Sequence, residues 1–434
     1  MTKKLLLLNF LLFSFCLSLN AQTTVVPQEA QKTDAAEIRR QSFEKVWTTV
    51  NEKHYDPTFG GVDWKKMREI YEPKALAAKT DAEFHKILNQ MLGELGLSHF
   101  NVIPRRAEAA ATTNASGGIT GIELKMIDGK AVVSRVEKDS TAEKVGLKPG
   151  FIIEKIDGKT VGELLAPIEK VVVEKKENNR IAQLYRERTV ASFLDGKPET
   201  IAQIDAINGA NKSQSFAVKR YVAKIEMSEA MGNFPPQAVV FESKLLDGNV
   251  GYIRFNMWII PQIMKIREAV RSMKSADGII FDLRGNPGGV GGMATGVAGL
   301  LVEEQTSLGS MKSRVSEQKF IVYPQTDPFK GKVVILMDYG SASTSEVFAA
   351  GMQEINRATI VGETSAGGVL PSLFDKLPTG AIFQYAISDY KSPKNVLIES
   401  RGVIPDKEIK LTRQSLLDGR DNQIEEAVKQ IKNK

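Results

Sequence analysis

The chain has one cysteine and three histidines among its 434 residues. Cys16 lies in a nearly unbroken apolar stretch, residues 5–19, between two lysines and a small residue, Ala21. We interpret residues 1–21 as a secretory signal peptide, so we expect an exported protein in the periplasm or the extracellular medium. Cleavage after Ala21 removes the only thiol, which excludes disulfides, cysteine metal ligands and a cysteine nucleophile. With three histidines left, no metal site is expected.

Long apolar runs and an excess of charge of one sign are also missing. The stretch 5–19 is short for a bilayer span and no comparable run follows, so no integral membrane association is expected. The formal net charge of +6 does not indicate binding to nucleic acid. Apolar residues make up 42% of the chain, and its length predicts two or three domains with packed cores.

The first part of the expected mature chain predicts a disordered linker, residues 22–37, and then an N-terminal helical region, residues 38–105. Its best-marked helix begins at the capping box Thr80-Asp81-Ala82-Glu83, carries an apolar stripe and ends at Gly96. Ser98-His99 follows directly. Histidine is the usual general base for a serine nucleophile at neutral pH, and irregular backbone after a packed helix suits a side chain aimed into a cleft.

Residues 117–222 change to short alternating strands and glycine turns that resemble a PDZ domain. The segments that carry the resemblance are Val132–Val136, Ala142–Gly150 and Ile152–Lys159. The resemblance implies that Gly121, Ile122, Glu123 and Leu124 form the loop whose N–H groups hold a peptide's terminal carboxylate while the peptide adds a strand. A charge-rich insertion at about 163–212 is expected to be helical, and it leaves open whether the groove is accessible.

Beyond a linker at 232–236, residues 240–434 alternate strand-like and helix-like segments. Strands are expected at Val250–Phe255, Gly278–Leu283, Val333–Met337 and Ala358–Val361, with helices at 263–273 and Glu346–Ile355. This alternation predicts a layered α/β core.

Two segments of this core could stabilise an oxyanion. A helix starts among Ser341, Ser343 and Ser345, and its N-terminus would supply backbone N–H groups and positive potential beside a serine nucleophile. However, Ser343-Thr344-Ser345-Glu346 is also a capping box, so a structural role stays open. The run Asp282–Gly289 leads from a strand into glycines that let N–H groups approach a carbonyl, or simply forms a turn.

Together these segments resemble the C-terminal processing (tail-specific) peptidases, secreted or periplasmic serine proteases with an inserted PDZ domain. The resemblance rests on Phe43–Trp47, Asp282–Gly289, Ser341–Glu346, Gly362–Thr364 and Gly402–Asp406. It implies a core of the Clp protease/crotonase-like class and aligns the family nucleophile with Ser343. The main branch of the family uses a lysine base, but this chain has Gly368 at that position.

The chain is similar instead to the tricorn-core branch, which implies a tetrad of Ser98, His99, Ser343 and Glu399. In the implied mechanism His99 takes the Ser343 proton, while Ser98 and Glu399 orient the imidazole. The implied oxyanion hole consists of the N–H groups of Thr344 and of Gly288 or Gly289. The resemblance leaves open which of Ser98 and Glu399 contacts His99, and it implies no cofactor.

We therefore expect a serine endopeptidase that cleaves exported proteins or peptides, with activity that rises through a histidine ionisation at about pH 6 to 7. Structural explanations stay open: His99 as a helix C-cap, Glu399 in an ion pair with Arg401, and Ser98 as a turn residue. An inactive peptidase-like PDZ protein that binds protein C-termini is an alternative, motivated by the missing lysine and by Phe100 after His99. A crotonase-like hydratase or esterase is a third interpretation.

Overall fold

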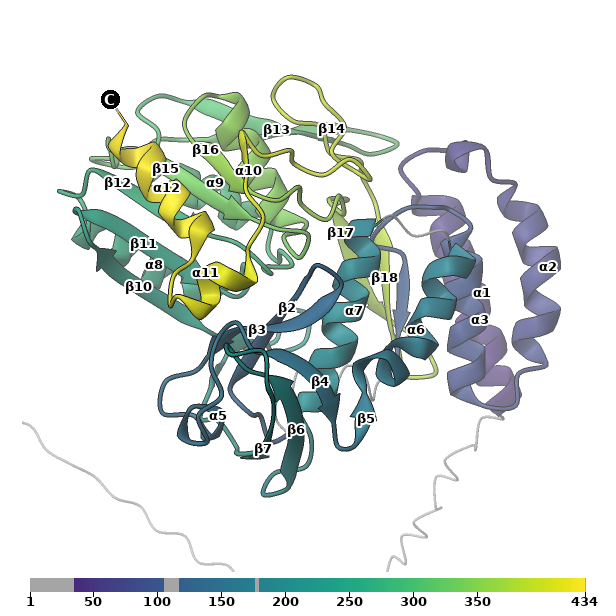
Figure 1. Ribbon diagram of the computed structural model, residues 1–434. Coiled ribbons are helices and arrows are strands. Elements are labelled where there is room, and N and C mark those ends of the chain that lie inside the picture. Colours follow the sequence, from purple (N-terminus) through teal and green to yellow (C-terminus); the bar gives the residue numbers. More distant parts are fainter. Residues whose placement is uncertain (1–34, 105–116, 176–178, 434) are drawn as a thin grey trace, which may run out of the picture.

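The computed structural model describes residues 35–104, 117–175 and 179–433 (Figure 1). The expected signal peptide and most of the expected linker 22–37 lie outside these residues. Residues 35–37 do not belong to a linker, because helix α1 begins at Ala35.

Helices form the N-terminal region, as expected. They are α1 (Ala35–Lys53), the 3-10 turn η1 (Phe59–Gly61), α2 (Trp64–Leu76) and α3 (Asp81–Gly93). Thr80 caps α3 by accepting a hydrogen bond from the Glu83 N–H at 3.1 Å, and the side chains of Phe84, Leu88 and Met91 are fully buried. The Thr80 cap and the apolar stripe thus define the start and the buried face of this helix as the sequence predicts, but the helix ends at Gly93, before the turn that contains Gly96.

These helices do not form a core of their own. They pack on a three-stranded antiparallel sheet in the order β1-β18-β17, built from β1 (Asn101–Ile103), β17 (Ser372–Lys376) and β18 (Ile382–Ala386). Strand β1 follows Ser98-His99-Phe100 almost directly, and its Asn101 pairs with Gln384 of β18. The pairing therefore places the segment with His99 beside β18, which belongs to the C-terminal half of the chain (Figure 1).

A second sheet has the strand order β2-β3-β4-β6-β7, with β5 paired to β4. We call this sheet, together with the helices between its strands, the β2–β7 domain. Its elements are β2 (Ile122–Ile127), β3 (Lys130–Val136), α5 (Thr141–Lys144), β4 (Ile152–Ile156), β5 (Lys159–Thr160), α6 (Val161–Lys175), α7 (Asn179–Leu194), β6 (Ile201–Ile207) and β7 (Ser213–Lys219). The expected helical insertion at about 163–212 is too long. Its helices end at Leu194, and residues 201–207 form a strand because alternate side chains enter the domain core, with Ala202, Ile204 and Ala206 buried.

The core is a six-stranded sheet in the order β10-β11-β12-β15-β16-β19, parallel except for the edge strand β10. Its strands are β10 (Phe241–Leu246), β11 (Val250–Phe255), β12 (Gly278–Asp282), β15 (Lys332–Met337), β16 (Thr359–Gly362) and β19 (Lys407–Glu408). The helices are α8 (Ile260–Ser272), α9 (Gly292–Ala298), α10 (Thr344–Glu354), α11 (Arg413–Leu417) and α12 (Asn422–Lys432). Helices α8, α9 and α10 contribute to one apolar cluster on the sheet, and α12 contributes to another (Figure 1). The predicted layered α/β core is confirmed.

The remaining elements extend from this body. They are the pair β8 (Glu226–Met227) and β9 (Ala238–Val239), and the hairpin β13 (Thr306–Lys312) and β14 (Glu317–Val322). None of the helices in the described ranges has the length and apolar character needed to cross a bilayer.

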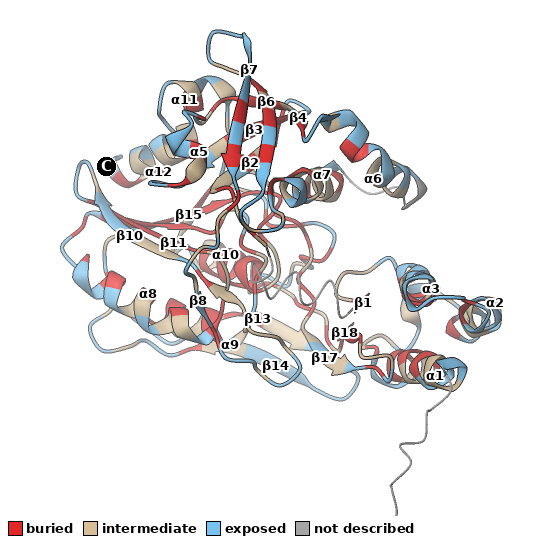
Figure 2. Ribbon diagram, turned by 90° about the horizontal axis from the view of Figure 1, so that it is seen from below, coloured by how far each residue is buried: buried red, intermediate tan, exposed pale blue. Residues whose placement is uncertain are grey.

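The parallel order brings three loops to one edge of the core sheet. Strands β12, β15 and β16 are neighbours, and their carboxyl ends lead into residues 283–291, 338–343 and 363–371. The carboxyl edge of a parallel sheet is where α/β proteins commonly place their sites. Figure 2 shows α10, which follows the second of these loops, as a buried helix in the middle of the molecule.

Candidate active site

Ser343 lies at the turn from β15 into α10, with an unusual backbone. Its φ of 55° and ψ of −118° fall outside the regions that a residue with a side chain normally occupies. Its N–H is shared between Gly368 O, at 2.8 Å, and Glu346 Oε2, at 3.0 Å. The Glu346 half of the predicted capping box is therefore present. A capping role alone needs no such backbone, because an N-cap residue normally has β-region dihedrals.

Ser98, His99 and Glu399 form one hydrogen-bonded chain. Ser98 Oγ lies 2.6 Å from His99 Nδ1 and donates to Glu399 Oε2 at 3.0 Å. Because the hydroxyl proton points at the carboxylate, Nδ1 must carry a proton and donate to Ser98 Oγ. Nε2 is then the unprotonated nitrogen, which is the tautomer a general base requires. Ser98 thus contacts the imidazole, and Glu399 acts on it through Ser98.

Glu399 is buried, with 6% of its surface exposed. Besides the hydroxyl of Ser98 it accepts the Ser98 N–H at 2.7 Å and the Val369 N–H at 2.9 Å. Burial raises the pKa of Glu399, and these hydrogen bonds offset part of that rise. The alternative of a surface ion pair with Arg401 is wrong, because Arg401 is exposed and Glu399 faces Ser98.

The segments that carry Ser343 and Ser98-His99 meet at Gly367-Gly368-Val369. Gly367 and Gly368 donate their N–H groups to Glu346, and Val369 donates to Glu399. A side chain at Gly368 would contact Ser98, since an added Cβ would lie 3.4 Å from Ser98 Cβ. Within the described residues the only hydrogen bond of the His99 ring is the one to Ser98, so His99 and Ser343 are not bonded directly in this state.

Burial also determines the protonation of His99, lowering its pKa to about 4. The ring is therefore neutral and able to accept a proton throughout the neutral pH range. The expected rise of activity through a histidine ionisation at about pH 6 to 7 assumes the pKa of a solvated imidazole, and it stays a prediction.

The glycine-rich loop after β12, residues 283–289, lies against the start of α10. Thr344 Oγ1 donates to Gly289 O at 2.9 Å, which joins the two segments. Gly288 N–H donates to Asn286 Oδ1 at 3.0 Å and is therefore already satisfied. Among the hydrogen bonds of the described residues, neither Thr344 N–H nor Gly289 N–H has an acceptor. Of the two glycines left open by the sequence, Gly289 is thus the one with a free donor.

Gly289 has a φ of 142°, and a Cβ there would lie 2.2 Å from Trp258 O. Any side chain would push the loop away from the backbone of Trp258, so this close approach requires glycine.

Several residues that the sequence did not single out support these loops. Ser345 Oγ accepts from Trp258 Nε1 at 2.9 Å and donates to Asn286 O at 3.1 Å. Asp338 Oδ1 accepts the N–H groups of Gly285 and Gly340, at 2.8 and 2.9 Å. The only sequence signal for such roles was that these residues fall within the glycine-rich and serine-rich runs.

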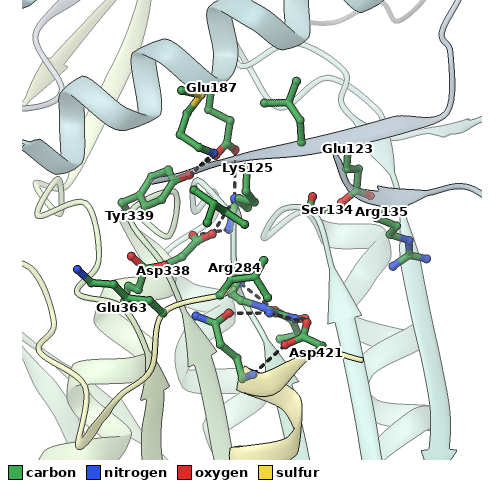
Figure 3. A pocket seen from close by; sticks show the side chains of 18 of the residues that line it. Glu123, Lys125, Ser134, Arg135, Glu187, Arg284, Asp338, Tyr339, Glu363 and Asp421 are labelled. Carbon is green, nitrogen blue, oxygen red and sulfur yellow. Dashed lines mark hydrogen bonds and ion pairs between the residues drawn. The ribbon is translucent and has the colours of Figure 1, made fainter. Parts of the chain in front are cut away.

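Of the predicted peptide-binding residues, Ile122, Glu123 and Leu124 begin β2 and line a cavity of about 880 Å³ between the β2–β7 domain and the core, and Gly121 precedes the strand (Figure 3). Glu123 pairs with Arg254 at 2.7 Å, and Lys125 pairs with Asp338 at 2.7 Å. These ion pairs fasten β2 to the core.

The outer edge of β2 is also partly occupied. Met126 O accepts from Gln183 Nε2 of α7 at 2.6 Å, and Met126 N–H donates to Tyr339 Oη at 3.3 Å. A peptide that adds a strand to β2 would have to displace both contacts. The accessibility of the groove, left open by the sequence, is therefore limited in this state.

The other two histidines have hydrogen-bond partners outside this cluster. His54 Nδ1 is 2.8 Å from Asp56 O, and its ring stacks on Phe100 with centroids 5.4 Å apart. His85 Nε2 lies 3.0 Å from Thr379 Oγ1. In the part of the chain that the structure describes, no three His, Cys, Asp or Glu side chains are grouped so that they could hold a metal ion.

Known proteins match this chain over most of its length. Residues 249–409 match the family model described as Peptidase family S41, and residues 35–93 match the Tricorn protease C1 domain. The carboxyl-terminal-processing protease of Synechocystis sp. is 25% identical over 370 residues, which cover 83% of this chain and 78% of the relative. The putative tricorn protease homolog 2 of Streptomyces coelicolor is 24% identical over 417 residues, which cover 92% of this chain but 32% of that longer relative.

Solved structures agree on the fold. The photosystem II D1 C-terminal processing protease superposes with a TM-score of 0.56 at 22% identity, covering 87% of this chain and 97% of that one. Mature CPAF complexed with lactacystin superposes with a TM-score of 0.59 at 12% identity, covering 91% and 98%.

The α/β core and the family matches define a serine-type peptidase, a hydrolase that acts on peptide bonds. Residues 249–409 match peptidase family S41, and the chain is similar over most of its length to a carboxyl-terminal-processing protease.

Proposed function

We propose that this chain is an exported serine endopeptidase in which Ser343 is the nucleophile and His99 is the general base. The observation that carries the proposal is the chain from His99 Nδ1 through Ser98 Oγ to Glu399 Oε2, because it leaves Nε2 as the proton acceptor. The exported location rests on the sequence pattern of residues 1–21 alone.

In the proposed reaction Ser343 Oγ attacks the scissile carbonyl carbon while His99 Nε2 takes the hydroxyl proton. The carbonyl oxygen becomes an oxyanion, bound by the N–H groups of Thr344 and Gly289. His99 then passes the proton to the leaving amine as the carbon–nitrogen bond breaks. Water, deprotonated by the same nitrogen, hydrolyses the acyl-enzyme and restores the Ser343 hydroxyl.

His99 and Ser343 have no direct hydrogen bond in the substrate-free chain. Catalytic hydrogen bonds are often formed only when substrate is bound. The two residues approach each other from opposite sides of Gly368, since Gly368 O accepts the Ser343 N–H while an added Cβ on Gly368 would meet Ser98. Proton transfer therefore requires substrate binding to bring His99 Nε2 within hydrogen-bond distance of Ser343 Oγ.

A fluorophosphonate probe and a casein digest test this function. We expect wild type to be labelled and to cleave casein, and Ser343→Ala to lose labelling entirely. We expect His99→Ala to lower the labelling rate by at least about 10⁴-fold. Ser316→Ala, on the exposed turn between β13 and β14, is the matched control and should behave as wild type. Unlabelled wild type would instead support the non-catalytic interpretation.

We further propose that the β2–β7 domain is a PDZ domain that receives the substrate's C-terminus. The strand order, the edge position of β2 and the helix α7 beside it support this assignment. Peptides with a free or an amidated C-terminus test it. We expect amidation to raise KM while kcat is unchanged, and equal KM values for the two peptides would contradict it.

A further inference from the structure

We propose that Glu346 is a positioning residue that holds the nucleophile and the histidine side of the site in register, a role that rests on the function proposed above. Glu346 occupies the third position of α10 and is fully buried. It is therefore more than a helix cap exposed to solvent.

The Glu346 carboxylate accepts four hydrogen bonds. Oε2 accepts the N–H groups of Ser343 and Gly368, both at 3.0 Å. Oε1 accepts the Gly367 N–H at 2.7 Å and the Ser365 hydroxyl at 2.5 Å. One side chain thus binds the nucleophile's own backbone and the loop after β16 at the same time.

Glu399 binds the same loop from the other side. It accepts the N–H of Val369, the residue after Gly368, and both donors of Ser98. The backbone at 367–369 therefore lies between two carboxylates, one that binds Ser343 and one that binds the Ser98-His99 pair. Because the chain has glycine where the main branch of the family has its lysine, this backbone rather than a side chain joins the two sides.

The four donors distinguish the charged from the neutral form of Glu346. A carboxylate can accept all four, but a carboxylic acid must use one oxygen to donate and meets donors on every side. Burial raises the pKa of Glu346 to about 7, and the charge of Glu399 adds to this rise. The hydrogen bonds from Ser365, Gly367 and Ser343 act in the opposite direction and lower the pKa. Tyr390 is the other titratable group close enough to interact with it, and within the described residues no lysine or arginine pairs with Glu346. The positioning contacts therefore form fully only above neutral pH.

Glu346→Gln tests this role, because the amide keeps the shape but presents N–H groups to donors. We expect its fluorophosphonate labelling rate and its kcat to fall roughly 10- to 100-fold at pH 8, the cost of a misplaced nucleophile, with KM changed less than about threefold. The wild-type labelling rate should rise with pH through about 7, and Glu346→Gln should lose this rise. Ser365→Ala removes one of the four donors but keeps the charge, so it should lower the rate less and keep the pH dependence.

Glu268→Gln, an exposed carboxylate on α8, is the matched control and should label as wild type does. If Glu346→Gln labels at the wild-type rate with the same pH dependence, the positioning role is wrong. If Glu346→Gln folds poorly, Ser365→Ala decides: a labelling rate identical to that of wild type also overturns the positioning role. Wild type that is not labelled at all overturns the proposed function instead, so the two failures are distinct.

Discussion

Glu399 accepts two hydrogen bonds from Ser98, one from the backbone N–H at 2.7 Å and one from the hydroxyl at 3.0 Å. The carboxylate therefore fixes both the position of Ser98 and the direction of its hydroxyl proton. The direction of the Ser98 hydroxyl proton in turn determines which nitrogen of His99 is protonated.

Glu399→Gln should change the tautomer of His99 while keeping a side chain of the same size at position 399. An amide nitrogen near Ser98 turns the hydroxyl proton toward Nδ1, which moves the ring proton to Nε2, the wrong nitrogen for a base. We expect kcat to fall by roughly 10²- to 10⁴-fold with little change in KM, measured by peptide cleavage. Glu408→Gln, on an exposed strand of the core sheet, is the control. Activity within twofold of wild type would show that Glu399 does not orient the imidazole.

Thr344→Pro removes the backbone N–H and the hydroxyl of Thr344, and it also restricts the backbone of Ser343, the residue before it. Proline is accepted at the first position of a helix, which Thr344 occupies in α10, but it has no N–H for the oxyanion. We expect kcat to fall by about 10²- to 10³-fold, the usual cost of one oxyanion-hole donor. Thr344→Val keeps the N–H and loses only the hydroxyl contact to Gly289, so it separates the two effects. Equal losses in both variants would mean that the hydroxyl contact, and not the N–H, matters.

The stability of the protein should depend on pH through His99. Because burial lowers the pKa of His99 to about 4 in the folded chain, from 6.5 for a free imidazole, the unfolded chain binds a proton first as the pH falls. The stabilisation is complete above about pH 6.5 and is lost as the pH falls toward 4. The melting temperature of wild type relative to His99→Asn should therefore decrease between pH 7 and pH 4.5. A constant difference across this range would show that His99 titrates normally.

The sequence could predict the layered core and the segments that meet in the site, because each has a strong local signal. Hydrophobic periodicity locates β11, β12, β15 and α10, and glycine and serine runs mark the loops after β12 and β15. Carboxyl ends of neighbouring parallel strands meet at one edge, so these loops converge once the topology is known.

Contacts between distant segments had no such signal. The N-terminal helices share their core with β18 because β1 pairs with that strand, and a three-residue strand leaves no periodic pattern. Glu346 looked like half of a capping box, and nothing in its local sequence shows that the loop around Gly367 folds back onto it. The pKa of His99 depends on burial, which only the packed structure reveals.

The base of the glycine-rich loop 283–289 contains a buried ion pair whose loss should strongly lower the stability of the protein. Arg284 pairs with Asp282 at 2.6 Å and with Asp421 at 2.8 Å, and only 1% of the surface of Asp282 is exposed. Burial raises the pKa of Asp282, but the charge and the hydrogen bonds of Arg284 outweigh burial and keep this pKa below its usual range. The Asp282 carboxylate is therefore charged. Arg284→Met leaves that charge buried without its partner, and we expect the free energy of unfolding to fall by about 3 to 5 kcal/mol in urea titrations. Lys330→Met breaks an exposed pair with Glu303 and should cost at most about 1 kcal/mol. A similar small loss in both variants would mean that water or a neighbouring group compensates Asp282 when the guanidinium is gone.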